Sequence, residues 1–181
     1  MNHSKYNTVI IEGPDRVGKN TQIEAIRNHF EGDLWQVLHY SKPPKLGSSE
    51  DYVSYQSSLF SQMFGLSCVV PKLILNRSHL GEAVYAQYRG YDGSYVFDIE
   101  KTWYDDETNE LLVIIVLIAR GDQLVGRDDG NSFYKNVDDA EEEVGRFIAA
   151  HNATVFTNKH IIDISGKTIE EVTLEIINIL T

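Results

Sequence analysis

Cysteine, positive charge and long apolar stretches are all scarce in this sequence of 181 residues. Cys68 is the only cysteine, which excludes an intrachain disulfide and a cysteine-based metal site. The longest apolar run, residues 111–119, is far too short to span a bilayer. Residues 1–6 are polar and too short for a secretion signal, so we expect a cytoplasmic protein without a membrane partner.

Negative charge dominates instead. The chain has 16 Lys plus Arg against 27 Asp plus Glu, a formal net charge of −11. Such a surface repels nucleic acids and anionic membranes, so no stable nucleic-acid binding is expected. A small anionic ligand held by a few well-placed cations remains compatible with this charge.

The hydrophobic content of 42% is enough for a folded core, and the length fits one domain over residues 1–181. Short apolar runs alternate with helical patterns. We expect strands at 8–11, 35–40, 73–75, 111–118 and 160–164, and helices at 20–30, 50–65, 78–89, 95–107, from 138 and from 168. Residues 168–171 form a capping box, and the apolar face of the last helix is expected to hold Ile169, Val172, Ile176, Ile179 and Leu180. The polar, glycine-containing segment 120–136 is expected to be an exposed, mobile loop.

Strands that are apolar throughout and alternate with helices predict an α/β fold. We expect a three-layer α/β/α sandwich around a mostly five-stranded parallel sheet. Ligands of such sheets bind beyond the carboxyl ends of the strands. The candidate functional residues follow strands in the sequence.

The segment Gly13–Lys19 fits the phosphate-binding pattern G-x-x-x-x-G-K and joins the first strand to the first helix. Gly13 and Gly18 allow the backbone to curl so that its N–H groups point at an anion. The helix N-terminus adds partial positive charge, and Lys19 adds a full charge toward the β- and γ-phosphates. This pattern predicts a P-loop NTPase fold and a nucleoside triphosphate, with ATP as the expected cofactor.

One position departs from the pattern. The residue after Lys19 is usually Ser or Thr, whose hydroxyl binds Mg²⁺, but here Asn20 stands there and Thr21 follows. An amide oxygen can bind a hard cation, so Asn20 is the candidate metal ligand. In the alternative, phosphates and waters hold the Mg²⁺ and the protein contributes little.

The longer string from Glu12 to Gln22 resembles the loop of thymidylate kinases and related deoxynucleoside monophosphate kinases, E-G-x-D-R-x-G-K-S-T-Q. Only the serine of that pattern is replaced. The resemblance implies that Arg16 stabilises the transferred phosphate and that Asp15 lies near the acceptor sugar.

A second segment, residues 76–85, resembles the family pattern D-R-Y-x-x-S-x-x-A-Y. By this resemblance Arg77 binds the acceptor monophosphate, and Tyr85 matches the family tyrosine. Glu82 lies between them and is a further candidate for the substrate site. Asn76 stands where the family has an aspartate that helps to organise water around magnesium.

Residues 120–136 occupy the place of the family's lid, which closes over the triphosphate. The resemblance implies that Arg120 and Arg127 lie near the phosphates, with Arg127 helping Arg16 in catalysis. The string from Arg127 through Asp128 and Asp129 to Gly130 is similar to lids of small viral or phage-type kinases. Lid closure would exclude water from the reaction.

The C-terminal segment 160–172 resembles the part of the family that completes the adenine pocket, so Gly166 and Lys167 are expected near the base. Across residues 31–70 the resemblance is weak. The family's E-P-G element is absent, and residues 40–44 read Tyr-Ser-Lys-Pro-Pro instead. The acceptor base therefore stays open.

Two further groups of side chains were ambiguous. The aromatic residues of the 50–65 helix could stack on an acceptor base, although core packing is the commoner role; they are Tyr52, Tyr55, Phe60 and Phe64. The acidic run Glu141–Glu143 is expected to be a solvated helix face.

Together these resemblances imply a kinase that transfers the γ-phosphate of ATP to a (deoxy)nucleoside monophosphate, dTMP or a related dNMP, with Mg²⁺. The partner would be a small nucleotide, and a homodimer stays open because the family often forms dimers. Three alternatives remain. They are a deoxynucleoside kinase with Asp15 or Glu82 as the base, a kinase of DNA or of a modified base in DNA, and a nucleotide-binding module that has lost catalysis.

Overall fold

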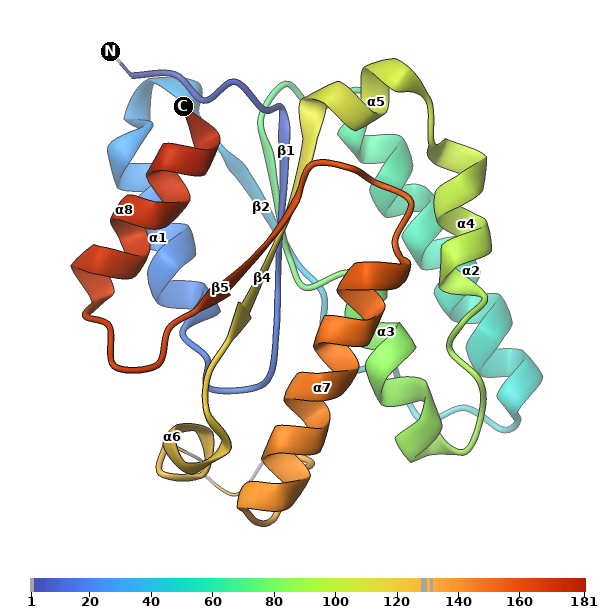
Figure 1. Cartoon of the computed structure of the whole chain (residues 1–181). Helices are drawn as coiled ribbons and strands as arrows, with labels where there is room; N and C mark the ends of the chain where they lie inside the picture. The colour runs from blue at the N-terminus through green and yellow to red at the C-terminus, as the bar shows by residue number, and fades with distance from the viewer. Residues whose placement is uncertain (1, 128–129, 131) are drawn as a thin grey trace.

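The computed structural model describes residues 2–127, 130 and 132–181. Within them, five strands form one parallel sheet in the order β2-β3-β1-β4-β5 (Figure 1). The strands are β1 (Thr8–Glu12), β2 (Gln36–His39), β3 (Leu73–Asn76), β4 (Leu112–Ile118) and β5 (Lys159–Asp163). The expected five-stranded parallel sheet is confirmed.

Helices cover both faces of the sheet. Helices α1 (Lys19–His29) and α8 (Ile169–Leu180) pack together on one face. The other face carries α2 (Ser49–Ser67), α3 (His79–Tyr85), α4 (Val96–Trp103), α5 (Asp106–Leu111) and α7 (Val137–Ala153) (Figure 1). The expected three-layer arrangement is therefore present.

The strands are apolar throughout because both faces of the sheet are buried. In β1, Val9 and Ile11 belong to the core beneath α1 and α8, while Ile10 belongs to the core on the opposite face. All three side chains are 0% exposed. This alternation follows from the two-residue period of a strand.

Helix α8 begins as predicted. The Thr168 hydroxyl accepts the main-chain N–H of Glu171, and the Glu171 carboxylate accepts the N–H of Thr168. Its apolar face was partly wrong, since Ile169 is 57% exposed while Ile177 is buried. Ile169 is the first residue of the helix and lines a surface cleft.

Two other expectations need correction. The helix expected over 95–107 is two short helices, α4 and α5, because Asp105 caps a new helix by accepting the N–H of Thr108. The helix expected over 78–89 ends at Tyr85 and continues as the 3₁₀ helix η2 (Ala86–Arg89). A further 3₁₀ helix, η1 (Glu31–Asp33), follows α1.

Strand β1 lies at the centre of the sheet, between β3 and β4. The chain leaves β1 toward one face, through α1, and leaves β3 toward the other, through α3. A crevice opens where connections diverge in this way, at the carboxyl ends of the strands. No helix among the described residues is long and apolar enough to cross a membrane.

Candidate active site

The loop between β1 and α1 curls back on itself at three residues with positive φ: Gly13 at 133°, Arg16 at 65° and Gly18 at 93°. Such backbone is inexpensive for glycine and strained for arginine. Lys19 is the first residue of α1 and folds over this loop, where its ammonium donates to the Gly13 and Pro14 carbonyls at 2.7 and 2.6 Å. The loop therefore has the shape expected of a phosphate cradle.

Burial lowers the pKa of the Lys19 ammonium to about 8, and the positive charge of Arg77 acts in the same direction. The Asp15 carboxylate opposes both effects. A buried cation with depressed pKa gains most from an incoming anion, because a phosphate would restore the favourable environment that water supplied.

Replacing Gly13 with alanine should unfold the loop locally and destabilise the protein. An added Cβ would lie 2.1 Å from the Leu117 carbonyl oxygen of β4, at a φ of +133° that side chains rarely adopt. We expect a loss of about 3 kcal/mol in the free energy of unfolding, measured by urea denaturation. Gly145→Ala is the matched control, since its Cβ meets nothing within 4 Å in helix α7. That change should be neutral or stabilise by up to about 1 kcal/mol. Equal stability of the two variants would contradict the close packing of the loop against β4.

A cleft of about 410 Å³ opens over this loop. It is called the phosphate cleft below, after the ligand expected from the sequence. Its lining contains three cations: Arg16, Lys19 and Arg77. The other lining residues are Asp15, Gly18, Asn20, Thr21 and Ser132. Sequence reasoning had placed all of these except Ser132 near the phosphates or the acceptor.

Arg77 follows β3 directly and has a positive φ of 67°. Its main-chain N–H donates to the Ile11 carbonyl at 3.0 Å, and its guanidinium forms an ion pair with Asp15. The next turn is held by the buried Glu12 carboxylate, which accepts the N–H groups of Ser78 and Gly81 at 2.6 and 3.1 Å. The end of β1 therefore fixes the direction in which Arg77 leaves the sheet.

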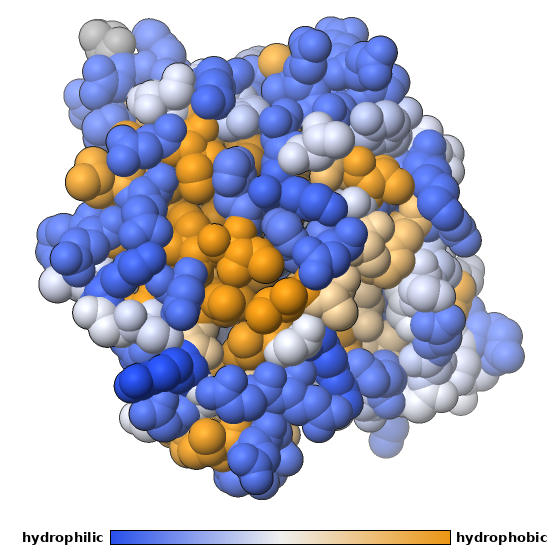
Figure 2. All heavy atoms as spheres, viewed as in Figure 1, coloured by the Kyte–Doolittle hydropathy of each residue, from blue (hydrophilic) through white to orange (hydrophobic). Residues whose placement is uncertain are grey.

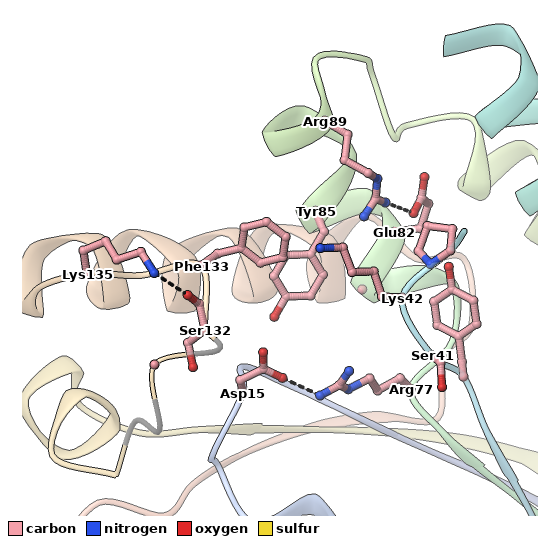
Figure 3. Close-up of a pocket in the computed structure, with 14 residues that line it drawn as sticks. Asp15, Ser41, Lys42, Arg77, Glu82, Tyr85, Arg89, Ser132, Phe133 and Lys135 are labelled. Atoms are coloured by element: carbon pink, nitrogen blue, oxygen red, sulfur yellow. Dashed lines mark hydrogen bonds and ion pairs between the residues drawn. The ribbon is translucent and has the colours of Figure 1, made fainter. Parts of the chain in front are cut away.

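A second cavity, of about 540 Å³, adjoins the first (Figure 3). It is lined by Asp15, Tyr40, Ser41, Lys42, Pro43, Arg77, Gly81, Glu82, Tyr85, Arg89, Gly130, Ser132, Phe133 and Lys135. Asp15, Arg77 and Ser132 line both cavities, so the two spaces meet at these side chains.

The second cavity combines aromatic faces with positive charge. The rings of Tyr85 and Phe133 stack with centroids 5.3 Å apart, and the Lys42 ammonium lies 5.6 Å from the Phe133 ring (Figure 3). Lys135 donates to the Ser132 carbonyl at 3.0 Å. Of the four cations in the lining, Arg77 and Arg89 are paired with carboxylates. Lys42 and Lys135 form no ion pair with any residue that the structure describes.

Glu82 lies at the wall of this cavity and is 0% exposed. Its two oxygens accept four hydrogen bonds, from Arg89, the Tyr91 hydroxyl at 2.5 Å, Gln56 at 2.8 Å and the Tyr95 hydroxyl at 3.1 Å. With all four lone pairs in use, this carboxylate organises the wall and has no spare capacity to take a proton from an acceptor.

The aromatic residues of helix α2 do not line the cavity. Phe60 and Phe64 are core residues, and Tyr52 stacks on Tyr91 with centroids 5.5 Å apart. Tyr55 is 42% exposed. The commoner role, packing, therefore holds for the two phenylalanines.

The expected lid is more structured than a mobile loop. Residues 121–125 form helix α6, and Leu124 and Tyr134 are buried. The Tyr134 hydroxyl donates to the main-chain carbonyls of Asp15 and Leu124, at 3.2 and 3.4 Å. This segment is anchored to the phosphate-binding loop because an aromatic residue near its end reaches the core. Asp128 and Asp129 lie outside the described residues.

The two lid arginines lie in different places. Arg127 lines a third cleft, of about 260 Å³, together with Arg16, Gly18 and Thr21, which also line the phosphate cleft. Arg120 is exposed, pairs with Asp122 and lines none of the three spaces. Arg120 therefore lies apart from the cleft over the loop between β1 and α1.

The far wall of this third cleft comes from the C-terminal segment. Its lining includes Ile164, Lys167, Thr168, Ile169 and Val172, but not Gly166. Gly166 has a φ of +73° and makes the turn before α8. Of the two residues expected near a base, Lys167 lines this cleft and Gly166 does not.

The two asparagines that depart from the family pattern contact each other. The Asn76 amide donates to the Asn20 side-chain oxygen at 2.7 Å. Asn76 Oδ1 is buried without a hydrogen-bond partner among the described residues. No cluster of three or more His, Cys, Asp or Glu suited to a metal occurs in residues 2–127, 130 and 132–181.

Glu143 is the residue that sequence reasoning misjudged most. The run Glu141–Glu143 was expected to be solvated, yet Glu143 is 1% exposed and accepts the Tyr85 hydroxyl at 2.8 Å. Its neighbours Glu141 and Glu142 are exposed, as expected. The helical position of Glu143, three and four residues from the buried Ala140 and Phe147, was the signal that could have revealed it.

Three solved structures share this architecture across nearly their whole length. The YorR protein of Bacillus subtilis, in complex with phosphorylated GDP, superposes with a TM-score of 0.67 at 13% identity, covering 94% of this chain and 93% of that one. Thymidylate kinase from Ehrlichia chaffeensis gives 0.62 at 15% identity, covering 96% and 98%. Thymidylate kinase from Candida albicans gives 0.59 at 15% identity, covering 98% and 92%.

The chain has the fold of the thymidylate kinases. No family model matches the sequence, and none of the curated proteins is similar to it. The likeness is thus one of architecture, and the short motifs of the sequence lie at its functional end. The phosphate-binding loop and Arg77 lie at the carboxyl ends of β1 and β3, where a ligand of this fold binds.

Proposed function

We propose that this protein is a nucleoside monophosphate kinase that transfers the γ-phosphate of ATP to a (deoxy)nucleoside monophosphate, with dTMP or a related dNMP as the acceptor. The observation that carries the proposal is the meeting of two cavities at Asp15 and Arg77. One cavity lies over the phosphate-binding loop, and the other has aromatic faces and four cations. A triphosphate and a monophosphate in these spaces would bring their phosphates together.

The loop amides and Lys19 would hold the β- and γ-phosphates. The third cleft, called the adenine-side cleft below, would bind the adenine. Arg77 would hold the acceptor 5′-phosphate in line with the γ-phosphorus. An oxygen of that phosphate attacks the γ-phosphorus, the bond to the β,γ-bridging oxygen breaks, and its electron pair leaves with ADP. No general base is needed because the attacking oxygen is already anionic.

Arg16 would stabilise the equatorial oxygens of the moving phosphoryl group, since it lines both the phosphate cleft and the adenine-side cleft. Arg127 lines the adenine-side cleft together with Arg16 but does not line the phosphate cleft. Its contribution is therefore better placed at the nucleotide than at the acceptor.

The residues present fit a hydrated Mg²⁺ that arrives with the triphosphate. Among the described residues, Asn76 Oδ1 is a buried oxygen without a hydrogen-bond partner. Asn20 Oδ1 accepts a hydrogen bond from the Asn76 amide, and Asn20 lines the phosphate cleft. Both are neutral oxygen donors, and Mg²⁺ in such sites is held mainly by phosphates and waters. When bound, the ion would neutralise charge on the β- and γ-phosphates.

The test is an ADP-release assay over the common nucleoside monophosphates and the corresponding nucleosides. We expect turnover with at least one deoxynucleoside monophosphate and none with its nucleoside. The opposite result would favour a deoxynucleoside kinase, although the saturated Glu82 and the ion-paired Asp15 are poor bases for that reaction. ATP binding without turnover of any acceptor would favour a nucleotide-binding module.

Arg77→Ala should raise the KM for the monophosphate by about 10- to 100-fold, because a charge-assisted hydrogen bond to phosphate is lost. The KM for ATP should change much less. Alanine meets the same positive φ as arginine, so the fold should persist. Arg27→Ala, on the exposed face of α1, is the control and should leave both constants unchanged. A selective rise in the KM for ATP would contradict the assignment of the acceptor side.

A further inference from the structure

Glu143 is a buried carboxyl group that has no role in the phosphoryl transfer described above. It lies on α7, and one oxygen, Oε1, accepts the Tyr85 hydroxyl at 2.8 Å. The other, Oε2, is buried with no hydrogen-bond partner in the part of the chain that the structure describes. A buried carboxyl with an unsatisfied oxygen costs stability, and such groups are concentrated at functional sites.

Tyr85 connects this carboxyl group to the acceptor cavity. The tyrosine ring forms part of the cavity wall, stacked on Phe133 (Figure 3). The same ring makes a T-shaped contact with Phe147, with centroids 5.8 Å apart and planes at 78°. Because the ring packs against both phenylalanines, the hydrogen bond of its hydroxyl to Glu143 completes its fixation in the cavity wall.

Titratable groups approach Glu143 from three other parts of the chain: the loop after β1, α3 and η2. Asp15 and Lys19 belong to the phosphate-binding loop, and their charges act on the carboxyl in opposite directions. Tyr85 and Tyr88 face it from α3 and η2. Burial is the largest effect and raises the pKa of the Glu143 carboxyl to about 7. At neutral pH the free protein therefore contains both its protonated and its ionised form.

We propose that Glu143 is a positioning residue of the acceptor site, which accepts a proton when a triphosphate occupies the phosphate-binding loop and then holds Tyr85 against the acceptor without adding negative charge. The proposal rests on the function proposed above, since it needs a triphosphate at Lys19. In the free protein, the Lys19 charge favours the ionised carboxylate. Bound phosphates would cancel that charge and add negative charge of their own, so the neutral acid becomes favoured.

The ionisation of Glu143 determines the direction in which kcat/KM should change with pH. The ionised carboxylate lies beside Asp15 and opposes the approach of further anions, whereas the protonated acid does not. The value of kcat/KM should therefore fall as pH rises through about 7, the range of the free protein. In Glu143→Gln, which is always neutral and keeps an oxygen for the Tyr85 hydroxyl, this fall should disappear. At pH 8 the variant should exceed the wild type by up to about tenfold in kcat/KM, and the two should be similar at pH 6.

Glu142→Gln is the matched control. It is the adjacent residue on the same helix, is exposed, and pairs only with Arg146 at the surface. Its pH profile should follow that of the wild type. Tyr85→Phe provides a second variant: the lost hydroxyl had favoured the ionised carboxylate, so the fall in kcat/KM should move to higher pH.

Calorimetry supplies a readout that a purely structural role would not affect. ATP is titrated at pH 7 in buffers of different ionisation enthalpy, which gives the number of protons taken up on binding. Wild type and Glu142→Gln should take up more protons than Glu143→Gln, by a fraction of one proton, since part of the free carboxyl is ionised at this pH. Thermal unfolding of each variant checks the fold.

The two proposals fail differently. Wild-type protein that binds no triphosphate would overturn the proposed function itself. Active wild-type protein whose pH profile and proton uptake match those of Glu143→Gln would overturn only the role of Glu143. If Glu143→Gln fails to fold, an unshifted profile in Tyr85→Phe has the same consequence.

Discussion

Replacing Lys19 with alanine should lower kcat/KM for ATP by about a thousandfold or more. Lys19 is the only lysine in the lining of the phosphate cleft, and its ammonium is already buried against the Gly13 and Pro14 carbonyls. A charge fixed in a water-excluded site stabilises the developing charge of transfer by several kcal/mol, which corresponds to this factor. Steady-state ADP release with saturating acceptor measures it.

The fold should survive this change. In the free protein Lys19 only satisfies two loop carbonyls, which water can reach once the side chain is gone. We expect the free energy of unfolding to change by less than about 1 kcal/mol. Lys101→Ala, on the surface of α4 and paired with Asp98, is the control and should retain full activity. Activity of Lys19→Ala near that of the control would remove the phosphate-binding loop from the mechanism.

Arg16→Ala should lower kcat by about 100- to 1000-fold while the KM for ATP changes little. The arginine lines both the phosphate and the adenine-side clefts, and a cation acting on the moving phosphoryl group contributes mainly in the transition state. Stability should be retained because alanine has the same Cβ constraint at the φ of 65°. Arg16→Lys, which keeps the charge and loses the planar fork, should recover only part of the rate.

If Lys19→Ala and Arg16→Ala both lose activity, their affinities for ATP distinguish the two roles. Lys19→Ala should weaken ATP binding in calorimetry, whereas Arg16→Ala should bind ATP with nearly wild-type affinity. Purified Arg16→Ala with near-normal kcat would contradict its assignment to the transferred phosphate. The proposed function could still hold with another cation, such as Arg77 or Arg127, in that role.

Much of the sheet and the phosphate-binding loop could be predicted because their signals are local. A run such as Thr8–Glu12, all of it buried, has few alternatives to a central parallel strand. Gly13, Gly18 and Lys19 lie within seven consecutive residues. The geometry of the loop that they form is therefore determined by local sequence. The capping box at Thr168 is equally local, and it formed as expected.

The sequence patterns did not reveal which side chains meet in the folded chain. Arg120 has the residue type expected in a lid, yet it pairs with Asp122 and lines none of the three clefts. No sequence motif marks Arg89, although it pairs with the buried Glu82 at the cavity wall. Tyr134 anchors the lid segment to Asp15 across more than a hundred residues of sequence.

From the sequence alone came the parallel α/β architecture, the phosphate cradle and the placing of Arg77 after a central strand, because each depends on residues adjacent along the chain. Only the tertiary structure decided that two cavities meet at Asp15 and Arg77, and that Glu143 is buried while Glu141 and Glu142 are in solvent. The reason is that burial is set by which helices pack together. The contact of α7 with α3 brings Glu143 to Tyr85, from 58 residues away in the chain.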